Sequence, residues 1–503
     1  MTDPPESPTA DLVPEEAGVE RHSIRRNIAQ MTGSQAVTWV LATVTAVIVP
    51  QFLGTELFGR LQLALSLWAI AAVFTALGTS LHLQLSIARH QREGLALIGD
   101  VFRVRTYAFV LAAAAAAAYV FAFENDREFA IIMTGIGAAS LLVLWSEVYQ
   151  SVFTGLERLS VLAFVDAAGK ALTLVLTLLV LTIGWGVYGV VGVAAGMAGL
   201  GLIVFVTQYR RVRPSGAIPR TGRLVPLLKS SAPYMAVTLA LTVYRQIDVI
   251  VISRVAGDRD VGWYGAADLL AGSLLFPTTV IMATVLPTFG RLHSEDPSRL
   301  RDLVRRTFSL LLLVAVPIGL GAAVVGPEFA PFLFGDEFDG TGTALQIFGP
   351  VTILSFGTTL LANVALAVGR ARFLALMLAA SAVITVVLDV FLVPWTADRY
   401  DNGAIGGAIA YVITETGQFV FALAVITPYL VTRRWAWTSV RVLAAGGVMV
   451  AATMPFRNEF FVVPALIGAL VYPTALLLFR CIDAEQRSMV ANLLGRGGHD
   501  EPT

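Results

Sequence analysis

Charged side chains inside long apolar stretches are the groups that could do chemistry in this chain. The stretch from Ser231 to Leu270 carries Arg245 and Asp248 near the middle of an apolar run long enough to span a bilayer. Three residues apart, they share one helix face, and Tyr244 lies one turn from Asp248. A charge at that depth is costly and usually functional. The alternative is an intrahelical ion pair that only stabilises a helix bundle.

A second charged pair occurs in an earlier apolar run. Asp166 and Lys170 are four residues apart, again on one helix face. Because they lie about a turn or two from the end of that run, a structural pair at the membrane interface and a role in a cavity are both open. The residues that we predict to line a substrate cavity are Arg245, Asp248, Lys170, Asp166 and Tyr244.

Isolated acids in the apolar runs are candidates for taking up a cation. Asp268 stands about two turns into its run with no opposite charge beside it in sequence. Glu147, Asp389 and Glu415 are also isolated, and a hydrogen-bonded role in helix packing is the alternative for each. The residues that we predict as ion-coupling candidates are Asp268, Asp248, Glu415 and Asp389.

The composition sets the class of protein in which these charges act. The 503 residues are 56% hydrophobic and only 14% charged, with a mean hydropathy of +0.75. A soluble domain is about one quarter charged. The chain is therefore predicted to be an all-α polytopic membrane protein.

Catalytic motifs are absent from the sequence. Gly169-Lys170-Ala171 lacks the first glycine and the hydroxyl of a phosphate-binding loop, so nucleotide hydrolysis is not expected. The sequence shows no Cys/His metal cluster, no Gly-x-Ser-x-Gly motif and no loop long enough for a catalytic domain. We expect a transporter rather than an enzyme, without a cofactor and without a nucleic-acid partner.

The apolar runs predict about fourteen transmembrane helices. They lie near residues 28–53, 61–87, 104–123, 129–153, 161–182, 187–209, 230–256, 261–290, 307–326, 343–368, 374–395, 404–427, 440–456 and 460–480. The segments Leu53–Gly59 and Ala256–Gly262 match each other, glycine to glycine. They indicate two six-helix lobes related as parallel repeats, followed by two further helices.

The expected domain division follows this repeat. It comprises a disordered cytoplasmic tail (1–27), an N-lobe (28–210), a basic linker (211–229), a C-lobe (230–430), the last two helices (431–480) and a second cytoplasmic tail (481–503). The loops on one side are rich in arginine, including Arg103 and Arg105, whereas those on the other side are acidic, such as Asp258-Arg259-Asp260. The excess of positive charge on cytoplasmic loops places both termini in the cytoplasm and the protein in the cell membrane.

A set of motifs occurs in the order found in one transporter family. The motifs are Pro50-Gln51-Phe52-Leu53-Gly54-x-x-x-x-Gly59, Ile87-Ala88-Arg89, Pro233, Arg245-Gln246-Ile247-Asp248-Val249-Ile250-Val251-Ile252-Ser253, Gly257, Val261-Gly262-Trp263-Tyr264-Gly265-Ala266-Ala267, Pro287, Arg291 and Leu333-Phe334-Gly335-x-x-Phe338. Over about residues 25 to 430 the chain resembles the Wzx-type polysaccharide flippases of the multidrug/oligosaccharidyl-lipid/polysaccharide (MOP) superfamily.

The resemblance implies a fold like that of the multidrug and toxic compound extrusion (MATE) transporters. It also implies a lipid-linked oligosaccharide on a polyprenyl diphosphate as substrate, a proton or sodium as coupling ion, and surrounding membrane lipids and a polysaccharide polymerase as partners. Arg245 and Lys170 are the basic residues that we place inside the spans, away from their ends. A cavity with more acid than base departs from what an anionic substrate favours. A cation-coupled MATE-type antiporter and a lipid II flippase therefore stay open as alternatives.

Overall fold

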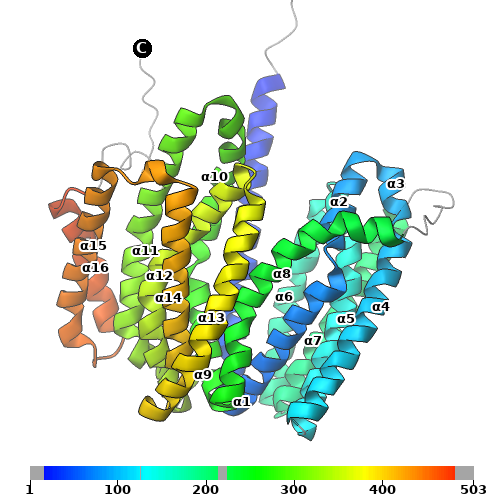
Figure 1. The fold of residues 1–503 in the computed structure, drawn as a ribbon, viewed down its shortest axis with the longest axis horizontal. Helices are drawn as coiled ribbons and strands as arrows, with labels where there is room; N and C mark the ends of the chain where they lie inside the picture. The colour runs from blue at the N-terminus through cyan, green and yellow to red at the C-terminus, as the bar shows by residue number, and fades with distance from the viewer. Residues whose placement is uncertain (1–15, 125, 213–223, 482–503) are drawn as a thin grey trace, which may run out of the picture.

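The computed structural model describes residues 16–124, 126–212 and 224–481, and in its first helix it places side chains from Thr38 onward. All regular secondary structure in these ranges is helical, which confirms the predicted all-α class. Figure 1 shows two groups of helices with two long helices, α1 and α8, running between them.

The first group, called the N-terminal bundle, contains α2 to α7. The elements up to its end are α1 (Glu16–Ala76), α2 (Thr79–Arg89), α3 (Gln91–Ala96), α4 (Ile98–Tyr119), the π-helix η1 (Val120–Glu124), α5 (Arg127–Gly155), α6 (Leu159–Thr182) and α7 (Gly186–Val212).

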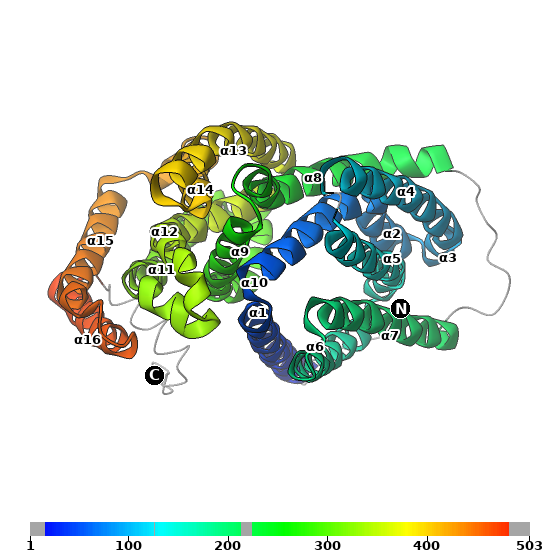
Figure 2. The same cartoon turned by 90° about the horizontal axis from the view of Figure 1, so that it is seen from below.

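The second group, called the C-terminal bundle, contains α9 to α14, and two further helices pack on its flank (Figure 2). The elements are α8 (Leu224–Val255), α9 (Asp258–Leu274), α10 (Phe276–Glu295), α11 (Pro297–Phe334), η2 (Asp336–Phe338), α12 (Asp339–Ala367), α13 (Ala371–Tyr400), α14 (Gly403–Val425), η3 (Pro428–Leu430), α15 (Arg433–Thr453), η4 (Met454–Phe456) and α16 (Val462–Leu478).

Eleven helices in the described ranges are long and apolar enough to cross a membrane, or twelve if the bent pair α9 and α10 forms one span. This is fewer than the number predicted from hydropathy, for two reasons. The first two predicted spans meet in the single element α1, which is kinked at Gly54 (φ 73°, ψ 175°). In addition, α16 has 17 residues and is shorter than a full span.

The ends of several helices differ from the hydropathy prediction. The first helix begins at Glu16, well before the predicted start at residue 28, so part of the predicted tail is helical. The span predicted at 261–290 is broken at Leu275 and bends by 42°. Hydropathy reports where apolar side chains begin, whereas helix ends depend on backbone hydrogen bonds and caps.

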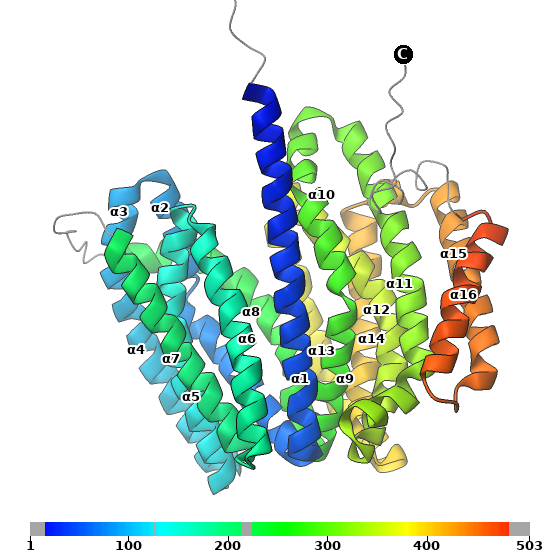
Figure 3. The same cartoon turned by 180° about the vertical axis from the view of Figure 1, so that it is seen from behind.

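The links between helices divide the charged residues between the two ends of the molecule. The links α2–α3, α10–α11 and α14–α15 lie at one end, here called the basic end, and carry Arg89, Arg92, Arg291, Arg299, Arg433 and Arg434. The links before α5, α9, η2 and α14 lie at the opposite, acidic end, and carry Asp126, Glu128, Asp258, Asp336, Glu337, Asp398 and Asp401. The two bundles converge at the acidic end and diverge toward the basic end (Figure 3).

Helix α8 connects the two bundles physically. Near its start, Leu227 is buried in a cluster with Leu83 and Ile87 of the N-terminal bundle. Farther along, Val249 and Ile252 belong to the core that contains residues of α9 and α12. The charged residues that the sequence singles out on α8 thus lie where this helix has joined the C-terminal bundle.

Candidate functional site

A buried polar core in the C-terminal bundle surrounds Asp248 of α8. The Asp248 side chain is 2% exposed and accepts a hydrogen bond from the hydroxyl of Tyr264 on α9. Asp389 on α13 is fully buried, and its carboxyl group interacts with that of Asp248. Otherwise Oδ1 of Asp248 and both oxygens of Asp389 have no donor among the described residues. Two acids far apart in sequence thus form one site.

A hydrogen-bonded pair of threonines begins one helical turn from Asp389. Thr385 stands one turn before Asp389 on α13, and its hydroxyl donates to Thr414 of α14 over 3.0 Å. Both threonines are buried. The sequence analysis did not select them, although a threonine four residues before a buried aspartate is a signal that helical spacing could have revealed.

Glu415 belongs to a second hydrogen-bonded cluster in the same bundle. It is 4% exposed and accepts hydrogen bonds from the hydroxyls of Tyr244 on α8, over 2.8 Å, and of Thr358 on α12. The Tyr244 and Tyr411 rings lie 6.2 Å apart. Tyr244 thus binds Glu415 rather than Asp248, its neighbour in the predicted helix face, because α14 packs against that side of α8.

Arg245 lies at the exposed edge of this polar core. No ion pair among the described residues joins it to Asp248. Its side chain is exposed, and it interacts electrostatically with Asp268 of α9 and Glu415 of α14. Asp268 is exposed as well. The intrahelical pair considered from the sequence is therefore absent, and Arg245 is shared with acids on other helices.

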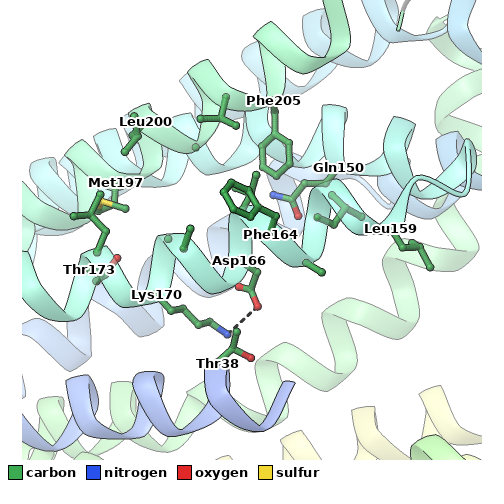
Figure 4. Close-up of a pocket in the computed structure, with 18 residues that line it drawn as sticks. Thr38, Gln150, Leu159, Phe164, Asp166, Lys170, Thr173, Met197, Leu200 and Phe205 are labelled. Atoms are coloured by element: carbon green, nitrogen blue, oxygen red, sulfur yellow. Dashed lines mark ion pairs between the residues drawn. The ribbon is translucent and has the colours of Figure 1, made fainter. Parts of the chain in front are cut away.

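Asp166 and Lys170 occupy a pocket of about 630 Å³ in the N-terminal half of the chain (Figure 4). Lys170 Nζ lies 3.3 Å from Asp166 Oδ2, and both side chains are partly exposed. The pocket is lined by α1, α5, α6 and α7, with Thr38 facing the ion pair and Phe164 on the opposite side of α6. No residue of α8 to α14 lines it. The five predicted cavity residues therefore fall into two places, one in each half.

One arginine makes more contacts than the sequence analysis assigned to it. Arg105, expected in a loop, is fully buried on α4 and donates to Thr79, Ser80, the Leu144 carbonyl and Glu147 over 2.6–3.3 Å. Glu147 is therefore not isolated. Arg103 and Arg105 are about 200° apart around a helix, so only one of them could face water. That spacing was the missed signal.

Comparison with known proteins identifies the family. The sequence profile of the polysaccharide biosynthesis protein family matches residues 24–293, and the MatE profile matches residues 233–391. The chain belongs to the polysaccharide biosynthesis protein family. The resemblance predicted from its motifs is confirmed. This is a transporter family rather than a family of enzymes.

Two curated relatives of this family member are named as transporters. The succinoglycan biosynthesis transport protein ExoT of Rhizobium meliloti is 24% identical over 341 residues, which is 64% of each chain. The chain thus spans slightly less than two thirds of the length of that relative. A putative O-antigen transporter of Shigella dysenteriae is 25% identical over 307 residues, covering 60% of this chain and 74% of the relative.

Solved structures share the fold of this family member. The lipid II flippase MurJ in an inward closed conformation aligns with a TM-score of 0.71, at 12% identity, over 93% of this chain and all of that one. An inward-facing MATE multidrug transporter aligns with a TM-score of 0.61, at 13% identity, over 79% of this chain and 96% of that one. The predicted MATE-like fold is confirmed at this level.

Proposed function

We propose that this protein is a flippase that moves a polyprenyl-diphosphate-linked oligosaccharide across the cytoplasmic membrane, from the inner to the outer leaflet, by alternating access. Family membership and the two curated relatives support a polysaccharide precursor as cargo. The observation that carries the proposal within the structure is Arg245, an exposed cation on a transmembrane helix. A diphosphate would compete with Asp268 and Glu415 for this guanidinium, which favours reversible binding.

The proposal includes the topology predicted from the sequence. Treating α1 as two spans joined at Gly54, α9 and α10 as one, and α16 as the last gives fourteen spans, arranged as two repeated six-helix lobes and a final pair. The basic end would face the cytoplasm, together with both termini. The lipid tail would remain in the bilayer, and a polysaccharide polymerase would receive the product.

Lys170 would provide a second cation for the substrate. It lies in the pocket of the N-terminal half with Asp166 as its partner and apolar side chains around it. A pocket that combines one ion pair with an apolar lining suits an amphiphilic ligand. In this scheme the headgroup moves between Lys170 and Arg245 as the two halves change their relative orientation.

The coupling ion would bind between Asp248 and Asp389. Two carboxyl groups that face each other away from water cannot both be ionised unless a cation joins them. A proton or sodium would satisfy the oxygens that lack donors, and Thr385, which is hydrogen-bonded to Thr414, stands one helical turn from Asp389. Glu415 and Asp268 are further candidates because they share the electrostatic environment of Arg245.

Replacing Arg245 by alanine tests the substrate site. We expect Arg245→Ala to be expressed and folded but to abolish surface polysaccharide, because the headgroup loses its exposed cation in the C-terminal half. Arg457→Ala, which removes an exposed arginine between α15 and α16, is the matched control and should be silent. Immunoblotting of membrane fractions and quantification of surface polysaccharide check both. Normal polysaccharide in Arg245→Ala would remove this residue from the site.

A cation-coupled MATE-type antiporter is the second candidate. The MatE profile covers residues 233–391, and the polar core of the C-terminal bundle is predominantly acidic. Drug efflux predicts that deletion of the protein increases sensitivity to cationic compounds while surface polysaccharide is unchanged. The flippase proposal predicts the opposite pattern in the same strain.

A further inference from the structure

The two halves meet at the acidic end through a pair of turns that the internal repeat makes equivalent. One is the Thr55–Gly59 segment after the kink in α1, and the other is the Asp258–Gly262 segment that begins α9. In the register of the repeat, Thr55 corresponds to Asp258 and Gly59 to Gly262. Figure 2 shows α1 and α9 next to each other.

Each glycine of this pair packs on the backbone of the opposite turn. A Cβ on Gly59 would overlap the Asp258 carbonyl, and a Cβ on Gly262 would overlap the Thr55 carbonyl. Because the same repeat positions appear on both sides with their roles exchanged, the contact resembles the two-fold interface of a dimer. Neither overlap can be relieved by a side-chain rotation, since backbone atoms would have to move.

Ion pairs flank the two turns and cross between the halves in both directions. Arg60 of α1 binds Asp258 over 2.9 Å, and Arg254 of α8 binds Glu124 and the Tyr119 hydroxyl. The four charged side chains of these two ion pairs are between 21% and 31% exposed, so water can replace either partner. Deeper in the interface the Phe58 and Phe338 rings, 6.4 Å apart, belong to the shared hydrophobic core.

Arg60 would keep partners if the turns separated. Its Nη1 lies 2.7 Å from Asp126 and 2.7 Å from Glu128, both in the N-terminal half, whereas only Asp258 belongs to the other half. Breaking the contact with Asp258 therefore leaves no unpaired guanidinium. This is the arrangement expected of a contact that opens and closes. The hydrogen bonds of Arg105, in contrast, are buried.

We propose that the paired turns Thr55–Gly59 and Asp258–Gly262 are the gate that closes the transport path at the acidic end, with Arg60–Asp258 and Arg254–Glu124 as its latches. The inference rests on the proposed alternating-access function. The two turns occupy equivalent positions on either side of one contact, so they separate in a single step when the gate opens. The structure has this gate closed.

Distance measurements between spin labels test the gate directly. The chain has a single cysteine, so Cys481→Ser provides a background for labels at Trp185→Cys and Tyr400→Cys, exposed positions at the acidic end of each half. We expect Gly59→Ala and Gly262→Ala to shift the population toward longer distances between the labels. Gly196→Ala and Gly272→Ala are matched controls because a Cβ at either position meets no atom within 4 Å.

A second variant keeps the test decisive if the alanine variants do not fold. Asp258→Asn removes one latch without adding bulk, and we expect it to increase the long-distance population by a smaller amount. The gate proposal is wrong if the label distances in Gly59→Ala match those in Gly196→Ala. If Gly59→Ala is unfolded, unchanged label distances in Asp258→Asn would overturn it.

Failure of the gate and failure of the proposed function are distinguishable, because the distances are measured on purified protein without substrate. Longer distances accompanied by normal surface polysaccharide would retain the gate and count against the flippase. Unchanged distances together with lost polysaccharide in Arg245→Ala would retain the flippase and reject the gate.

Discussion

Asp248 and Asp389 lie together in the structure, although their spacing in the sequence does not predict that they are neighbours. Arg245 and Asp248, which spacing does connect, differ in exposure because the boundary of the buried core runs between them along one side of α8. The sequence identifies which residues are charged at depth, and helical spacing identifies neighbours on one helix. Contacts between α8, α13 and α14 depend on tertiary packing, and spacing carries no signal for them.

The carboxyl pair leads to a prediction for Asp389→Asn. The amide has the shape of the carboxyl group and cannot ionise, so we expect the free energy of unfolding to change by no more than about 1 kcal/mol. Transport should lose its dependence on the proton or sodium gradient, because the ion has lost one of its two acidic ligands. Export assayed with and without an ionophore checks this. Asp398→Asn, an exposed acid on the same helix, is the control, and gradient dependence retained in Asp389→Asn would contradict the coupling site.

Helix α4 shows that hydropathy predicts the position of a helix but not which of its faces is buried. The apolar run predicted a span at 104–123, and α4 with η1 covers it. The same analysis left Arg105 in a loop because it counted charges along the chain without asking which helix face they occupy. Arg105 instead connects α4 to the first turn of α2 and to α5.

This connection predicts unequal effects for two arginines on α4. Arg105→Ala leaves the buried Thr79 hydroxyl without the guanidinium that donates to it and should lower the free energy of unfolding by about 1–3 kcal/mol. Arg103→Ala removes a partly exposed arginine 3.7 Å from the buried carboxyl group of Asp100 and should cost less, because water can reach the place that the guanidinium leaves. Chemical unfolding in detergent compares the two. Similar losses would show that Arg105 does not hold the three helices together.

At the scale of the whole molecule, the motifs predicted the family and the MATE-like fold correctly. The glycines of the repeat, Gly59 and Gly262, can be recognised in the sequence, but their packing on the opposite turns cannot. A repeat shows which positions are equivalent, and it does not show which positions touch each other. The charge of the links was equally readable, and the structure assembles it into a basic and an acidic end. The proposed orientation places the basic end in the cytoplasm.

Labelling of single cysteines in intact cells decides that orientation. In the Cys481→Ser background, Ser294→Cys lies near the α10–α11 link at the basic end, and Asn458→Cys lies between α15 and α16 at the acidic end; both positions are exposed. Because positively charged loops are retained in the cytoplasm, a membrane-impermeant maleimide should label Asn458→Cys in intact cells and Ser294→Cys only after permeabilisation. The reverse pattern would place the closed gate on the cytoplasmic side. Inner-to-outer flipping would then require the gate to admit substrate rather than release it.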